Sequence, residues 1–137
     1  MNKRLQLPLI LAVIVVISSC AMKPAGTVYV KDGKEYGKVA GTFRHRWWNY
    51  YERGVSYADG QFYPEAISDF KAAIRQRESD QRRARTYGMH FVDYFPHREL
   101  GIVYFLRGDL QSAQKELERS LSEVPFRKRP VLSRPRA

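Results

Sequence analysis

An internal repeat constrains the fold of this chain more than any other feature of its sequence. Three residues of the first half recur in the second half at a constant separation of 47 positions: Gly54 and Gly101, Tyr57 and Tyr104, and Ala66 and Ala113. Around both sets, apolar residues are spaced three and four positions apart, which places them on one face of an α-helix. The pattern indicates a mostly α-helical fold that stacks two copies of one helical unit.

Each unit is predicted to be a helix-turn-helix, the first within residues 47–78 and the second within residues 96–125. Gly60 and Gly108 mark the two turns, because glycine and its polar neighbours break helices. Pro64 opens the second helix of the first unit, since proline in the first turn has no amide hydrogen to leave unbonded. We therefore expect four helices joined by short connections.

A small β-hairpin is predicted ahead of the helices. Asp32 and Gly33 separate two β-prone runs, at 27–31 and 34–38. An Asp-Gly pair favours the type I′ turn, which needs positive φ at both central residues. Two strands alone are only marginally stable, so the hairpin should dock on the helices or remain mobile.

The N-terminus has the pattern of a secretory signal. Lys3 and Arg4 precede an apolar stretch, Leu7–Ile17, and small residues follow it. A helix that crosses a membrane needs about 20 apolar residues. The stretch is too short for that and is typical of a signal peptide.

The segment Ile17-Ser18-Ser19-Cys20 resembles a bacterial lipobox. The resemblance implies that residues 1–19 are removed and that Cys20, the one cysteine of the chain, carries the lipid that anchors the protein to a membrane. Ala21 is not the aspartate that retains lipoproteins at the inner membrane, so the resemblance implies the periplasmic face of the outer membrane. Residues 20–46 would then form a lipidated tether and the hairpin.

The repeat itself resembles the tetratricopeptide pattern, a helix-turn-helix of about 34 residues. The resemblance rests on small and large residues at the expected packing positions: Tyr50, Gly54, Tyr57, Ala66, Phe70 and Ala73, then Leu100, Gly101, Tyr104, Ala113 and Pro125. Departures stand at Arg53, Glu78, Leu117 and Ser120. The resemblance covers residues 47–127. This segment is also similar to the N-terminal helical part of envelope lipoproteins, some of which continue into a caspase-like peptidase domain.

In tetratricopeptide proteins the first helix of each unit lines a concave groove that binds peptides. The resemblance implies that seven residues line such a groove here: Trp48, Tyr51, Val55, Ala58, Arg98, Ile102 and Phe105. Their apolar character favours a hydrophobic protein segment as the ligand, with Arg98 as an orienting charge. The alternative is that the hairpin or an insertion covers these aromatic residues.

Two repeats are fewer than the three or so that such stacks normally need. The outer face around Leu117, Leu121 and Val124 is therefore expected to be covered by a partner, a second copy of the chain or the inserted segment. Self-association is one outcome of this expectation.

The separation of 47 exceeds a 34-residue period, which predicts an insertion near residues 80–93. The insertion contains Arg82, Arg83 and Arg85, followed by aromatic residues. We expect a helix whose arginines pair with nearby carboxylates: Glu78, Asp80 and Asp93. The alternative is an inserted loop whose basic patch binds a polyanion such as lipopolysaccharide, phospholipid or nucleic acid.

The net charge of the chain is +10, but its distribution weakens nucleic acid as a partner. Two of these charges belong to the signal peptide and five follow Phe126, which leaves +3 (10 minus 2 minus 5) for the rest. The end of the chain is rich in arginine and proline and poor in apolar residues, so residues 128–137 are expected to be a flexible basic tail.

The sequence offers no set of residues for catalysis, and no cofactor or metal is expected. The one thiol is assigned to lipid, and His45, His90 and His97 form no tight metal-binding pair. No glycine-rich phosphate loop is present. The sequence thus predicts a lipid-anchored module for protein interaction or assembly in the bacterial cell envelope, and not an enzyme.

Overall fold

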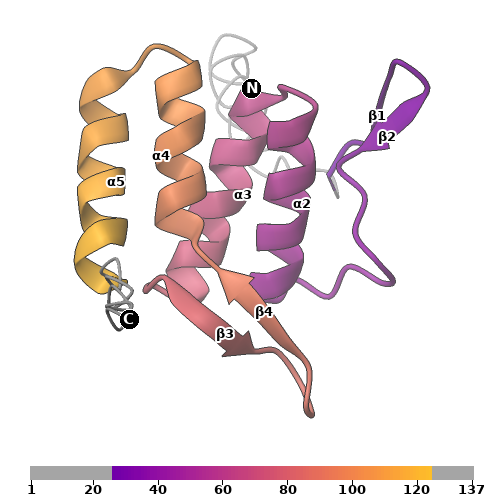
Figure 1. The fold of residues 1–137 in the computed structure, drawn as a ribbon. Helices are drawn as coiled ribbons and strands as arrows, with labels where there is room; N and C mark the ends of the chain where they lie inside the picture. The colour runs from indigo at the N-terminus through magenta and orange to yellow at the C-terminus, as the bar shows by residue number, and fades with distance from the viewer. Residues whose placement is uncertain (1–25, 125–137) are drawn as a thin grey trace, which may run out of the picture.

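The computed structural model describes residues 26–124 (Figure 1). Within them, two β-hairpins and four helices follow one another in this order: β1 (Tyr29–Lys31), β2 (Lys34–Tyr36), α2 (Trp47–Asp59), α3 (Tyr63–Gln76), β3 (Gln81–Arg85), β4 (Phe91–Tyr94), α4 (Pro96–Leu106) and α5 (Leu110–Glu123). The predicted fold class is confirmed: mostly helical, with two helix-turn-helix units preceded by a small hairpin. The predicted signal peptide, Cys20 and the basic tail lie outside the described residues.

The four helices lie side by side, with α2 packed on α3, α3 on α4, and α4 on α5 (Figure 1). Proline stands in the first turn of both helices, at Pro64 in α3, as expected, and at Pro96 in α4. Asp109 caps α5, since its side chain accepts a hydrogen bond from the backbone N–H of Ser112 at 3.1 Å. Such a cap satisfies one of the backbone donors that every helix start leaves open.

The two repeated units share the same close packing between their helices. A Cβ added to Gly54 would lie 2.9 Å from the ring of Phe70, and one added to Gly101 would lie 2.7 Å from Cγ of Leu117. Phe70 and Leu117 occupy equivalent positions of the two units, so the same close approach between the two helices is built twice. Glycine is needed at both places because a side chain there would push the helices apart.

The core has two parts. The larger lies between the helix pairs and is formed by Tyr57, Ala66, Ile67, Phe70, Leu100 and Val103. The smaller joins the start of α2 and the end of α3 to the second hairpin, and is formed by Trp47, Ala73, Ala84 and Tyr94. The second hairpin is therefore fixed to the helical layer by buried side chains.

The N-terminal segment docks on the helices through its first strand. Asp32 and Gly33 have φ values of 54° and 75°, as a type I′ turn requires. Tyr29 stacks on Phe62 at a centroid distance of 4.2 Å. The hydroxyl of Tyr57 donates a hydrogen bond to the carbonyl of Thr27 at 2.7 Å.

The inserted segment is a β-hairpin, and the prediction of a helix or a loop there is wrong. β3 and β4 pair antiparallel, with Ala84 opposite Val92 and Arg85 opposite Phe91. Alternation decides the structure, because Ala84 and Tyr94 face the helices while Arg85 and Phe91 face outward. The hydroxyl of Tyr94 donates to the carbonyl of Arg77 at 2.7 Å and so ties the hairpin to the end of α3.

The ion pairs expected for the insertion are also absent. No carboxylate of residues 26–124 lies within ion-pair distance of the guanidinium groups of Arg82, Arg83 and Arg85. Glu78 binds Arg119 of α5 instead, at 2.6 Å. Asp80 accepts the backbone N–H of His97 at 2.9 Å and thereby caps the start of α4. The three acids bind Arg119 and backbone N–H groups instead of the guanidinium groups of the insertion.

Candidate functional site

The first of two clefts beside α2 lies between this helix and the β3–β4 hairpin, and we call it the aromatic cleft. Its volume is about 520 Å³. Ten residues line it: Ala40, Trp48, Asn49, Tyr51, Glu52, Val55, Thr86, Tyr87, His90 and Val92. Three of the seven predicted groove residues, Trp48, Tyr51 and Val55, are thus brought together in one cavity.

Aromatic packing holds the helical wall of the cleft in place. The ring of Trp48 meets Trp47 edge to face at 5.4 Å and lies 6.5 Å from Tyr87 at the hairpin tip. Tyr51 packs edge to face against Tyr94 at 5.0 Å. Burial, helped by the negative charge of Glu99, raises the pKa of Tyr51 to about 12, so its phenol stays neutral.

The polar groups at the rim of the cleft are bonded to neighbouring protein atoms. The carboxylate of Glu52 accepts the backbone N–H of Ala40, and the side-chain oxygen of Asn49 accepts the N–H of Arg44, both at 2.9 Å. Across the cleft, the hydroxyl of Thr86 lies 2.9 Å from Nδ1 of His90. These bonds fix the walls and leave a surface that is mainly aromatic and aliphatic.

The remaining predicted groove residues do not line this cleft. Arg98 pairs with Glu99 at 2.8 Å and lies over the ring of Phe95 at 4.3 Å. Ile102 and Phe105 are exposed on α4, at 41% and 60% of their full surface. Ala58 is half-buried near the end of α2. The insertion covers the cleft from one side only, so Trp48 and Tyr51 are neither fully covered nor fully open.

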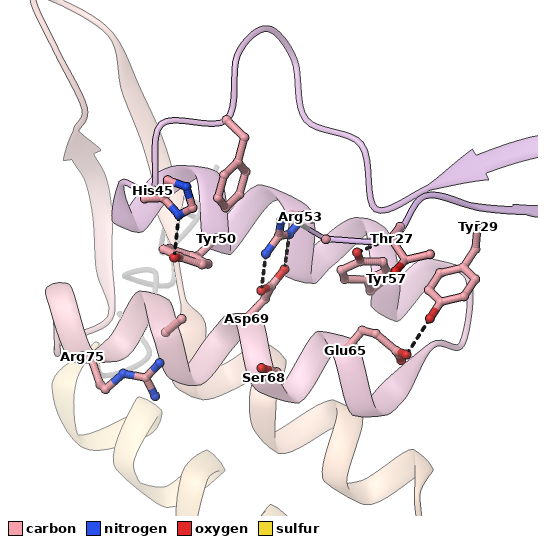
Figure 2. A pocket seen from close by; sticks show the side chains of 13 residues that line it. Thr27, Tyr29, His45, Tyr50, Arg53, Tyr57, Glu65, Ser68, Asp69 and Arg75 are labelled. Carbon is pink, nitrogen blue, oxygen red and sulfur yellow. Dashed lines mark hydrogen bonds and ion pairs between the residues drawn. The ribbon is translucent and has the colours of Figure 1, made fainter. Parts of the chain in front are cut away.

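The second cleft, the polar pocket, lies between α2 and α3 under the N-terminal segment and has a volume of about 560 Å³ (Figure 2). At its centre, Arg53 of α2 binds Asp69 of α3 through two hydrogen bonds of 2.6 and 2.8 Å. The guanidinium also lies 4.0 Å from the ring centroid of Phe43. Arg53 is therefore engaged on its edge by a carboxylate and on its face by an aromatic ring.

The two ends of the polar pocket are occupied by further side-chain bonds, which Figure 2 shows on either side of the central pair. The hydroxyl of Tyr29 donates to Glu65 at 2.8 Å, and Nδ1 of His45 lies 3.1 Å from the hydroxyl of Tyr50. These contacts come from the N-terminal segment on one side and from the helices on the other. The pocket is therefore mainly the packing interface between this segment and the helices.

The three histidines lie in different environments. His45 bonds Tyr50 and His90 bonds Thr86. His97 is buried, with Nδ1 at 2.5 Å from the carboxylate of Glu116 and Nε2 at 2.8 Å from the carbonyl of Glu78. Among residues 26–124, no group of three or more histidines, cysteines or acids is placed to hold a metal ion.

The predicted basic patch is exposed on β3. The guanidinium of Arg83 lies 5.4 Å from the ring of Phe91, and Nε of Arg85 donates to the carbonyl of Gly88 at 2.5 Å. Arg82 turns toward α4 and lies 6.0 Å from the ring of Phe95. The patch therefore mixes cationic and aromatic surface.

Sequence reasoning missed the contribution of the hairpin to the aromatic cleft, namely Tyr87, His90 and Val92. The available clue in the sequence was the polar Asp93 between the apolar Val92 and Tyr94, because such alternation is typical of a strand with one covered face. No helix within residues 26–124 is long and apolar enough to span a membrane.

No protein-family model matches the chain, and the searches of curated proteins and of solved structures found no match either.

Proposed function

We propose that this protein is a lipid-anchored, tetratricopeptide-like module of the bacterial cell envelope that binds a protein or peptide segment in the aromatic cleft. The observation that carries the proposal is the convergence of Trp48, Tyr51 and Val55 with Tyr87 and Val92 around one open cavity. Clefts lined by apolar and aromatic side chains, with a few fixed polar groups, are typical ligand sites. No catalytic constellation is part of the proposal.

The chemistry of the cleft favours a segment that inserts an apolar side chain. The side-chain oxygens of Glu52, Asn49 and Thr86 are already bonded to the protein, so a ligand gains mainly by burying apolar area. A cavity of about 520 Å³ holds a few side chains and not a whole domain. We therefore propose an exposed loop or terminus of a partner protein as the ligand, rather than a large flat surface.

A photocrosslinking residue at position 55 tests this assignment in intact cells that make the full chain. Val55 lines the cleft, whereas Phe105 is exposed on α4 and was predicted for the same groove. We expect adducts from position 55 and few from position 105, and we expect Trp48→Ala to remove those at 55. Equal adducts at both positions, or no effect of Trp48→Ala, would contradict the cleft as the binding site.

The membrane anchor needs its own experiment, because Cys20 lies outside the described residues. The proposal follows from the lipobox resemblance and places the protein at the periplasmic face of the outer membrane. Cells fed a labelled fatty acid should incorporate it into the chain, and Cys20→Ser should abolish the label. A chain that takes up label in the Cys20→Ser variant would refute anchoring at this cysteine.

A further inference from the structure

We propose that the β3–β4 hairpin docks on an anionic lipid membrane through its outer face and its tip. The outer face consists of Arg83, Arg85, Phe91 and Asp93, and the tip consists of Tyr87, Gly88 and Met89. The proposal does not depend on peptide binding, because Arg83, Arg85 and Met89 do not line the aromatic cleft; Tyr87 belongs to both surfaces.

The two faces are separated by the geometry of the strands. Side chains alternate between the two sides of a β-hairpin, and residues paired across the strands share a side. Ala84 is paired with Val92 on the side of the helices, and Arg85 is paired with Phe91 on the opposite side. A membrane on the outer face would therefore leave the cleft accessible from the helix side.

The tip carries exposed apolar surface beside the contacts that Tyr87 makes with Trp48 and His90. Met89 is 82% exposed and Tyr87 is 70% exposed, and the hairpin projects beyond the layer of helices (Figure 1). Tyrosine is enriched at the boundary between lipid and water, where its ring is buried and its hydroxyl stays wet. Burial of the neighbouring methionine in the same layer removes further apolar area from water.

The charge of the outer face complements an anionic lipid surface. The guanidinium groups of Arg83 and Arg85 have no carboxylate partner among the described residues. The one acid on this face, Asp93, accepts the backbone N–H of Arg83 at 3.1 Å. Guanidinium groups bind phosphate through two parallel hydrogen bonds. Nε of Arg85 already donates to the carbonyl of Gly88, so the two Nη atoms of Arg85 and the guanidinium of Arg83 remain to bind lipid phosphates.

A bulge in β3 brings an additional arginine to the surface. Gln81 pairs with Tyr94 and Ala84 with Val92, so that Arg82 and Arg83 together stand opposite Asp93. Arg83 has φ at 55°, a conformation that is costly for a residue with a side chain. A regular strand would turn Arg82 to the same side as Ala84, toward the helices. With the bulge, Arg82 stays exposed at the edge facing α4, beside Phe95, and Arg83 lies on the outer face.

The tip favours a membrane over a nucleic acid. Arginine and tyrosine can both contact a single strand of nucleic acid through phosphate and stacking contacts. Met89, the most exposed residue of the tip, has no ring to stack on a base and gains most from an apolar layer. Lipid therefore accounts for the basic residues and the apolar tip together.

The experiment places a fluorophore that is sensitive to polarity at the tip of the full chain. With Cys20→Ser, the single native thiol is removed, and Met89→Cys supplies a unique labelling site. The control carries the label at Gln114, which is exposed on α5. Vesicles contain either phosphatidylcholine alone or a mixture with phosphatidylglycerol. We expect a blue shift at position 89 with the anionic vesicles, and little change at position 114 or with phosphatidylcholine alone.

A second variant tests the arginines. Arg83→Gln with Arg85→Gln, in the chain labelled at position 89, should weaken binding to anionic vesicles by about 25-fold, since each basic residue near the surface contributes about fivefold. Circular dichroism of the variant should match that of the parent. Equal responses at positions 89 and 114, no effect of the arginine substitutions, or a response to single-stranded DNA but not to vesicles would overturn the proposal.

Discussion

Arg53 of α2 and Asp69 of α3 form a bidentate ion pair, with distances of 2.6 Å between Nε and Oδ2 and 2.8 Å between Nη2 and Oδ1. The side chains retain only 11% and 7% of their exposure. Arginine is the better cation for such a site, because its planar fork matches a carboxylate. The pair therefore fixes the relative position of the two helices of the first unit.

Removing the carboxylate of Asp69 should lower the free energy of unfolding more than removing an exposed acid does. Asp69→Ala leaves the guanidinium of Arg53 largely buried without its counter-ion, and we expect the free energy of unfolding in urea to fall by about 3 kcal/mol. Asp59→Ala, at an exposed acid at the end of α2, should cost about 0.5 kcal/mol or less. Replacing both partners, as Arg53→Met with Asp69→Leu, should cost less than Asp69→Ala. Equal losses for Asp69→Ala and Asp59→Ala would refute this account.

The glycine at the second helix crossing should not tolerate a methyl group. In Gly101→Ala the new Cβ would lie 2.7 Å from Cγ of Leu117, and we expect a loss of about 1–3 kcal/mol from overpacking. This loss appears even though alanine is the better helix former by about 1 kcal/mol. Leu117→Ala in the same chain should recover part of it. Strictly additive losses, measured by urea unfolding of the single and double variants, would show that the two positions do not clash.

The cap of α5 should make stability sensitive to acid. The hydrogen bonds between Asp109 and Ser112 lower the pKa of the Asp109 carboxyl below its usual value. The ionised form is thus favoured in the folded state, and its contribution is lost as pH falls from the ordinary aspartate pKa of about 3.9 through the folded value. Asp109→Asn keeps a capping oxygen but cannot titrate. Its stability relative to the parent should therefore improve between about pH 6 and pH 3. A constant difference over this range would contradict the prediction.

The cleft residue Tyr51 should make the fold sensitive to alkali. Burial raises the pKa of its phenol to about 12, against about 10 in an unfolded chain. Between these values the folded state holds a proton that the unfolded state loses, so stability falls as pH rises, by about 1.4 kcal/mol per pH unit for this group. In Tyr51→Phe the slope of unfolding free energy against pH should be smaller by that amount. An unchanged slope would indicate that Tyr51 ionises as readily in the folded chain.

The helices could be predicted because the residues that end them and form the turns act locally in the sequence. Gly60 and Gly108 end the first helix of each unit, Asp32-Gly33 forms the expected turn, and the spacing of 47 gives the matched crossings at Gly54 and Gly101. The second hairpin was missed because its bulge breaks the two-residue alternation between Gln81 and Ala84. The three consecutive polar residues at that point, Gln81 to Arg83, show no alternation of polar and apolar side chains.

The candidate site was predictable on its helical side only. Trp48, Tyr51 and Val55 share one face of α2, and that face follows from their spacing. The opposite wall comes from Tyr87, His90 and Val92, more than thirty residues further along the chain. Their approach to α2 depends on Tyr94 packing against Trp47, with ring centroids 4.6 Å apart. Such a contact arises from tertiary packing and leaves no periodic trace in the sequence.

The docking of the N-terminal segment has a mechanical consequence. Thr27 is bonded to Tyr57, Tyr29 stacks on Phe62, and the backbone N–H of Gly37 donates to Ser56 at 3.0 Å. A pull on the chain ahead of Gly26 would load the contact of Thr27 with Tyr57 first. The contacts of Tyr29 with Phe62, at the start of α3, and of Gly37 with Ser56 would follow. The bonds that hold the rim of the aromatic cleft, at Ala40 and Arg44, lie further along the chain and would carry tension only after the first contacts rupture. Tension applied ahead of Gly26 would therefore reach the cleft only after the contacts between this segment and the helices break.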